Sequence, residues 1–304
     1  MVNIKSEIEH LWRESEPLTA TAILMMVAFV FSIAGIFLDD RMITGVPAWL
    51  KPSKFAISTA IYSATLACLF RYLTVWPRFV RAMGWVVSIV LVAEVAIIDA
   101  QAARGTTSHF NVSTPLDSAL FGIMGTSIVV LWLASIGVLV ALFRQKFRDT
   151  DWGWSLRLGM LITVLGSAVG GTMTRMMPEQ RETIRVTHKI TRVGAHTIGA
   201  PDGGPGLPGL GWSTEHGDMR VAHFFGLHGV QIVPLLSLLW GRRRVFGVAA
   251  SYLGLIAILT WQGLRGQPLI RPDGLTLAAL AIWLTASGIA LVRIAPHAEV
   301  ARSY

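Results

Sequence analysis

Eight blocks of about twenty mostly apolar residues, separated by short charged or Gly- and Pro-containing segments, dominate this sequence of 304 residues. A helix of about twenty residues is long enough to cross the roughly 30 Å hydrocarbon core of a bilayer. We predict membrane-spanning helices at 18–38, 55–74, 83–103, 116–143, 154–176, 220–241, 244–265 and 274–294. The chain is therefore expected to be an all-α integral membrane protein, a bundle of about eight transmembrane helices.

The composition agrees with this prediction and excludes several other classes. Apolar residues make up 53% of the chain and charged residues only 14%, against about 25% charged in an average soluble protein. The net charge of +8 lies in segments between the spans, so it indicates membrane orientation and not nucleic-acid binding. Cys68 is the single cysteine, which excludes an internal disulfide and a Cys-pair metal site. Gly203, Gly204 and Gly206 follow no predicted strand, so nucleotide binding is excluded as well.

Basic residues mark one end of the predicted bundle. With eight spans both termini lie on one side, together with the short basic loops at 71–81, 144–148 and 242–244. Positive residues in short loops remain in the cytoplasm during insertion. We therefore expect both termini to be cytoplasmic and the lipid bilayer to be the main partner.

The predicted spans divide the chain into five segments. These are an amphipathic N-terminal segment (1–17), five spans (18–176), an outer Gly-, Pro- and His-rich loop (177–219), three spans (220–294) and a C-terminal tail (295–304). An even number of spans permits two four-helix halves in the same orientation. The segments 45–55 and 209–225 each place a tryptophan after a Gly-containing turn, as an internal duplication would.

The outer loop is expected to be a structured lid over the helix ends. Its prolines and glycines restrict the backbone and favour tight turns. Leu207, Leu210 and Trp212 would each gain roughly 1.5–3 kcal/mol on full burial. The alternative is a mobile loop with incidental histidines.

Ionisable residues within the predicted spans are the strongest functional signal, because each costs roughly 2.5–3.5 kcal/mol to insert. At about 1.5 Å rise per residue, Glu94 and His228 would lie at similar depth, and so would Asp99 and His223. We therefore predict a polar pocket that opens to the outer face between the third and sixth spans, with Glu94 and Asp99 as catalytic residues. The alternative interpretation is a set of scattered hydrogen bonds between helices.

Histidines and carboxylates are dense from the outer loop into the sixth span, where five of the eight histidines lie between 188 and 231. Imidazole and carboxylate ligands suit transition metals, although no established metal-binding spacing occurs here. His223 and His228 are five residues apart, about 140° around a helix, so they do not face the same ion. The candidate metal ligands are His196, His216, His223 and Glu215, and the candidate cofactor contacts are His223, His228, Arg175 and Arg220.

Two resemblances add expectations. The segment GAHTIGAPDGGPGLPGLGWSTEHGDMRVAHFFGLHGVQ (194–231), with WLKPSKFAIS (49–58), resembles a family of uncharacterised bacterial multi-pass membrane proteins, which implies a helical protein of the bacterial cytoplasmic (inner) membrane and no particular activity. Eight spans in about 300 residues, with histidines near the outer face, are also similar in architecture to haem A synthase. This sequence departs from that family, because its intramembrane histidines lie in one span and it has no Glu-x-x-x-His motif.

Three classes of function remain open at this point. The first is a membrane-embedded haem- or metal-binding protein, an oxidoreductase with haem b or a transition metal ion as cofactor. The second is a small-solute or proton-coupled transporter or channel, in which Glu94, Asp99, His223 and His228 bind substrate or relay protons. The third is a non-catalytic membrane subunit or assembly factor, acting as a homo-oligomer or with a partner membrane subunit.

Overall fold

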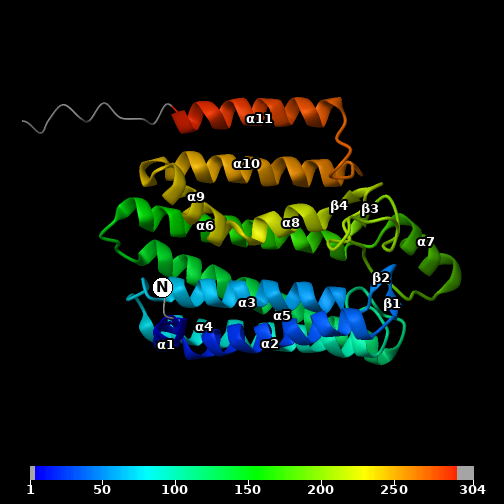
Figure 1. The fold of residues 1–304 in the computed structure, drawn as a ribbon. Helices are drawn as coiled ribbons and strands as arrows, with labels where there is room; N and C mark the ends of the chain where they lie inside the picture. Colours follow the sequence, from blue (N-terminus) through cyan, green and yellow to red (C-terminus); the bar gives the residue numbers. More distant parts are fainter. Residues whose placement is uncertain (1–3, 293–304) are drawn as a thin grey trace, which may run out of the picture.

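The computed structural model describes residues 4–292, and nearly all of its regular structure is helical (Figure 1). The α-helices are α1 (Ile4–Glu14), α2 (Glu16–Leu38), α3 (Leu50–Phe70), α4 (Pro77–Ala103), α5 (Pro115–Arg144), α6 (Thr150–Gly170), α7 (Pro178–Thr187), α8 (Met219–Leu227), α9 (Gly229–Trp240), α10 (Val245–Leu264) and α11 (Gly274–Val292). Two short 3-10 helices are η1 (Gly171–Thr174) and η2 (Arg242–Arg244). The expected tail at 295–304 lies outside the described residues.

Two small antiparallel ribbons complete the fold. Strand β1 (Met42–Ile43) pairs with β2 (Val46–Pro47) in the turn between α2 and α3. Strand β3 (Thr197–Ile198) pairs with β4 (Gly217–Asp218) and so closes the outer loop directly before α8. Both ribbons therefore lie at the point where the chain re-enters the helix bundle.

Seven helical segments of the described chain are long and apolar enough to span a membrane, and the bent pair α8–α9 makes an eighth. The prediction of an all-α bundle of about eight spans is confirmed. The second span begins at Leu50 and not at 55. Lysines and a proline in its first turn lower the hydropathy there, but proline is tolerated in the first turn of a helix. The outer loop also contains a helix, α7, which was not predicted.

The bundle has two ends that differ in their connections (Figure 1). We call one the loop end, which carries the connections 39–49, 104–114, 171–218 and 265–273. The other is the short-loop end, where α1 and the last described turn of α11 also lie. The two ends of the described chain are therefore on the same side, as an even number of crossings requires.

The helices pack as two sets of four. Helices α2, α3, α4 and α5 contact one another, and α6, α8–α9, α10 and α11 form the second set. The packing of α5 against α6 connects the sets. This arrangement agrees with the expected four-helix halves.

The last turns of α4 and α10 share a sequence pattern, Gln-x-x-Arg-Gly, at 101–105 and 262–266. Gly105 and Gly266 both adopt left-handed backbone, with φ of 73° and 74°, a conformation that glycine adopts at no steric cost. The residue after each glycine donates its N–H to the glutamine carbonyl, at 3.0 Å in α4 and 3.2 Å in α10. The two helix ends therefore have the same local structure as well as the same pattern.

The arginines of this pattern also make the same contact. Arg104 pairs with Asp117 of α5 at 2.8 Å, and Arg265 pairs with Asp273 directly before α11 at 2.5 Å. Each arginine thus joins the end of one helix to the beginning of the next. The third helix of each four-helix set therefore ends in the same local structure and is joined to the fourth by the same kind of ion pair.

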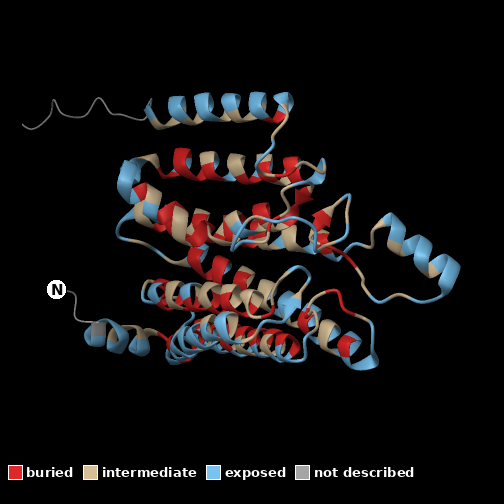
Figure 2. Ribbon diagram, turned by 45° about the vertical axis from the view of Figure 1, so that its right-hand side comes forward, coloured by how far each residue is buried: buried red, intermediate tan, exposed pale blue. Residues whose placement is uncertain are grey.

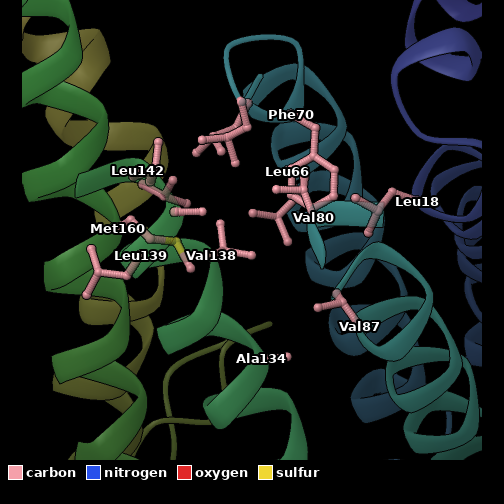
Figure 3. Packing of buried hydrophobic residues seen from close by; sticks show 14 of the residues in the cluster. Leu18, Leu66, Phe70, Val80, Val87, Ala134, Val138, Leu139, Leu142 and Met160 are labelled. Atoms are coloured by element: carbon pink, nitrogen blue, oxygen red, sulfur yellow. The ribbon is translucent and has the colours of Figure 1, made fainter. Parts of the chain in front are cut away.

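A large apolar cluster fills the short-loop half of the bundle between the two sets (Figure 3). Leu66 of α3 and Val87 of α4 come from the first set, and Met160 comes from α6 of the second. These three side chains are fully buried. Leu11 of α1 packs against this cluster while Trp12 is exposed, as expected for an amphipathic helix on the membrane surface.

Burial is uneven across the molecule (Figure 2). Helix α11 packs mainly on α10, and Thr276 is its one buried residue in the described chain. The described side chains of α7 include no buried one. Helices α7 and α11 therefore offer almost no enclosed side chains, and most buried polar groups of the described chain lie in the other helices and under the outer loop.

Candidate functional site

The outer loop is organised around one carboxylate, Asp202. It accepts hydrogen bonds from the backbone N–H groups of His196 and Thr197 at 3.0 and 3.1 Å, and from His196 Nδ1 at 2.7 Å. Burial opposes ionisation of Asp202, but the bond from His196 and the charges of Arg192 and Arg220 hold its pKa below the ordinary value of 3.8. Burial also lowers the pKa of His196 below 6.5. The loop is thus held by a neutral histidine and an ionised aspartate.

The loop packs back onto the helix ends, which confirms the expected structured outer loop. Trp212 is 9% exposed and stacks edge-on against Phe224 of α8, with ring centroids 5.6 Å apart. Lys54 of α3 donates to the carbonyl of Leu210 at 2.8 Å. The Leu210 side chain itself is 40% exposed, so its predicted burial is wrong, whereas Leu207 packs in the same cluster as Trp212.

Beneath the loop end, three ionisable side chains from three elements meet. Lys51 lies in the first turn of α3, Glu94 lies on α4, and His109 lies in the connection between α4 and α5. His109 Nδ1 is 3.0 Å from Lys51 Nζ, and His109 Nε2 is 3.6 Å from Glu94 Oε1. The imidazole therefore lies between the ammonium and the carboxylate.

The partners of His109 assign its protons. When Lys51 is an ammonium it only donates hydrogen bonds, so Nδ1, which also lies 3.1 Å from Ser108 Oγ, accepts from Lys51 and the proton of the neutral ring lies on Nε2, facing Glu94. Burial lowers the pKa of His109 well below 6.5, and the nearby Lys51 ammonium lowers it further. Glu94 is 3% exposed, and neither carboxylate oxygen has a hydrogen-bond partner among the described residues. A buried, unpaired carboxylate is costly, so this position calls for a proton or a ligand.

His223 faces this group from the second set of helices. Its Nδ1 donates to the carbonyl of Gly166 on α6 at 2.9 Å. A Cβ atom at Gly170 would lie 2.8 Å from His223 Cε1, so the absence of a side chain there makes room for the ring. Helix α6 therefore holds His223 in the neighbourhood of His109 and His196.

The sixth span is broken at His228, where α8 and α9 meet at a bend of 60°. The break frees backbone groups inside the membrane, where they need other partners. Thr163 of α6 supplies both, because its hydroxyl donates to the carbonyl of Leu227 at 3.2 Å and accepts from the N–H of Val230 at 2.9 Å. Tyr252 of α10 donates to the carbonyl of residue 225 at 2.6 Å. Hydrogen bonds from α6 and α10 thus stabilise the break between α8 and α9.

A further polar contact joins the two sets near this break. Gln231 Nε2 of α9 donates to Thr65 Oγ1 of α3 at 3.2 Å. The amide oxygen of Gln231 is buried without a partner among the described residues. His228 stacks on Phe224 with ring centroids 4.5 Å apart. Polar groups therefore continue along the seam between the sets, below the Lys51, His109 and Glu94 group.

The residues expected at similar depth come from helices that pack against different neighbours. Within the described chain, Glu94 forms no hydrogen bond or ion pair with His228, and the ionisable side chain beside it is the neutral imidazole of His109. Helix α4 packs against α2, α3 and α5, whereas α8 packs against α6 and α10, so equal depth did not imply contact. Asp99 remains half-buried, with one carboxylate oxygen buried and unpartnered in the described structure.

The predicted metal and cofactor ligands are not brought together. Among the described residues, no group of three or more His, Cys, Asp or Glu side chains could hold a metal ion. Glu215, His216 and Arg220 line a cavity of about 230 Å³ in the loop, below the roughly 300–1,000 Å³ of typical ligand sites. Arg220 is engaged by Asp218 at 2.5 Å, and the predicted contact Arg175 is exposed after η1.

Comparison of the chain with protein-family models, curated proteins and solved structures found no significant match. The fold itself defines the class, a multi-pass helical membrane protein. The resemblances drawn from the sequence remain expectations.

Proposed function

We propose that this protein is a membrane transporter for a small polar solute, with its binding site under the loop end where the two four-helix sets meet. The observation that carries the proposal is Glu94, whose buried carboxylate lacks a hydrogen-bond partner in the described chain and lies beside His109. Ionisable residues within spans are expensive and commonly mark substrate or proton pathways. With the basic short-loop end in the cytoplasm, this site faces the outside.

The architecture supports the same proposal. Many transporters are built from repeated helical units and bind substrate where the repeats meet, at helices that are broken within the membrane. Here the third helix of each four-helix set ends in the shared Gln-x-x-Arg-Gly pattern, and α8–α9 is broken at His228 beside the seam. The bonds of Thr163 keep this break satisfied.

The seam between the sets is asymmetric along its length. Polar groups occupy the part towards the loop end, while Leu66, Val87 and Met160 belong to the cluster that fills the short-loop half. Transport requires a second conformation in which this cluster opens, so the described state is the one closed at the short-loop end.

The haem and metal expectation is not carried forward, because the residues present do not fit these groups. Within residues 4–292, no group of three or more His, Cys, Asp or Glu side chains could hold a metal ion. No step of the proposal therefore involves a metal or a haem.

The test is accessibility from the short-loop end. Cys68 is exposed, so it is first replaced by alanine, and Met160→Cys is then introduced in the full chain reconstituted in vesicles. A membrane-impermeant maleimide is applied to the short-loop end, while L-amino acids, dicarboxylates and polyamines are added singly at the other side. We expect the maleimide to label the cysteine at position 160. At least one of these solutes should change the rate of this labelling.

The matched control is Ala60→Cys, which is buried in a smaller cluster between α2, α3 and α4 and should stay unlabelled. If position 160 is as unreactive as position 60 under every condition, the short-loop end does not open and the transport proposal is wrong.

A further inference from the structure

We infer that His109 carries protons between the loop-end surface and Glu94, so that the site binds a proton as well as a solute. The inference deepens the proposed transport function by naming the coupling ion. The proton transfer itself rests only on the geometry of Lys51, His109 and Glu94.

His109 lies between Glu94 and the loop-end surface. The Glu94 side chain is 3% exposed, and its nearest ionisable neighbour, His109, is 22% exposed. Phe55 stacks on the His109 ring on the α3 side, and Phe110 contacts it edge-on, with ring centroids 5.7 and 6.1 Å away. Aromatic rings thus flank the imidazole on two sides and leave its two nitrogens facing Lys51 and Glu94.

An imidazole can accept a proton on one nitrogen while it releases the proton of the other. In the forward step the Nε2 proton of His109 forms an O–H bond with Glu94, and Nδ1 takes a proton from the Lys51 ammonium. Lys51 regains its proton from water at the loop end. One proton has then moved from water to Glu94, the carboxylate has become neutral, and His109 has changed tautomer.

The groups that face His109 support this shuttle role. They are Lys51 from α3, Glu94 from α4, His196 from the outer loop and His223 from α8. Burial and the Lys51 ammonium keep the pKa of His109 well below 6.5. The ring is therefore neutral at pH 7 and passes a proton on without trapping it as a stable cation. The distance of 3.6 Å to Glu94 must shorten slightly for the transfer.

The second four-helix set lacks acidic residues at the positions that correspond to Glu94 and Asp99. When the two Gln-x-x-Arg-Gly patterns are aligned, Glu94 of α4 corresponds to Leu255 of α10, and Asp99 corresponds to Thr260. An acidic group in the membrane is thus present at these positions in the first set only. Such a difference between the sets is expected when one of them holds the proton site.

The experiment measures protonation of Glu94 directly in the full chain in lipid nanodiscs. The infrared band of its protonated carboxyl is assigned by its loss in Glu94→Gln, and its growth is followed after a rapid drop in pH. We expect His109→Ala to slow this growth by on the order of 100-fold, the lower range for loss of a positioned proton-transfer group. Added imidazole should restore the rate.

The control is His188→Ala, since His188 is exposed at the end of α7, and the rate should remain at the wild-type value. The inference fails if His109→Ala protonates Glu94 at the wild-type rate. It also fails if His109→Ala is folded, shown by an unchanged unfolding temperature, and imidazole does not restore the rate.

This result is separable from the transport test. If labelling at Met160→Cys responds to solute but His109→Ala has no effect, transport stands without the shuttle. If imidazole rescues proton transfer but position 160 never reacts, the shuttle stands and the transport proposal is wrong.

Discussion

Replacing Thr163 with valine removes one hydroxyl while keeping the shape of the side chain. That hydroxyl serves both backbone groups freed at the α8–α9 break, the carbonyl of Leu227 and the N–H of Val230. Both would be left in a buried, apolar setting, because Val230 is 2% exposed and lipid offers no hydrogen bonds. The substitution should therefore destabilise the bend itself.

The size of the effect follows from two limits. Leaving two buried backbone groups unsatisfied would cost up to about 2–6 kcal/mol, at roughly 1–3 kcal/mol each. Side-chain hydrogen bonds within membranes average only about 0.6 kcal/mol, because the unfolded chain also finds partners. We expect Thr163→Val to lower the free energy of unfolding by about 1–3 kcal/mol, between these limits.

The assay is reversible unfolding in mixed micelles, with Thr126→Val as control. Thr126 on α5 is exposed and bonds only to the carbonyl of Gly122 within its own helix, so its loss should cost less than about 0.5 kcal/mol. If the two variants are equally stable, Thr163 does not hold the break.

Two further predictions concern packing and pH. Gly166→Ala should lower the free energy of unfolding by at least about 3 kcal/mol, the upper value for overpacking, because the added Cβ would lie 2.2 Å from the backbone of α8. The control is Gly122→Ala, which should be neutral in the same unfolding assay because its added Cβ would have no neighbour within 4 Å. The pKa values of Asp202 and His196 both lie below their ordinary values of 3.8 and 6.5, so the unfolded loop binds more protons than the folded one. Loop stability should be full at pH 7 and fall as the pH drops from about 6.5 towards 4. The protection of the Thr197 amide against hydrogen exchange, relative to its intrinsic rate at each pH, should fall over that range because this amide donates to Asp202, and in Asp202→Asn it should be low at both ends of the range.

The spans could be predicted from the sequence because the bilayer imposes a length and a polarity on each helix. The break in the sixth span could not, since hydropathy does not report backbone direction. Gly229 at the break and Pro234 inside α9 were the available signals, because both weaken a helix. Partner groups such as Thr163 come from another helix and leave no mark in the local sequence.

The candidate site was predicted in part. Glu94 was correctly singled out as a costly residue within a span, but pairing by depth ignores which helices are neighbours and which way each side chain faces. His109 was not predicted, because it lies in the connection between α4 and α5, outside the predicted spans and outside the His-rich outer loop. The duplication was predicted from the connections 45–55 and 209–225, and the pattern Gln-x-x-Arg-Gly at 101–105 and 262–266 was a further signal for it in the sequence.

In the proposed transporter, protonation of the buried Glu94 carboxylate towards the loop end is coupled to opening of the apolar cluster at the short-loop end. This coupling is tested most directly by maleimide labelling of Met160→Cys from the short-loop end, with the pH at the loop end varied, in chains with Glu94 and with Glu94→Gln. We predict that the rate of labelling at position 160 depends on the pH at the loop end when Glu94 is present. In Glu94→Gln the rate should be independent of that pH. An identical pH dependence in both chains would contradict this coupling.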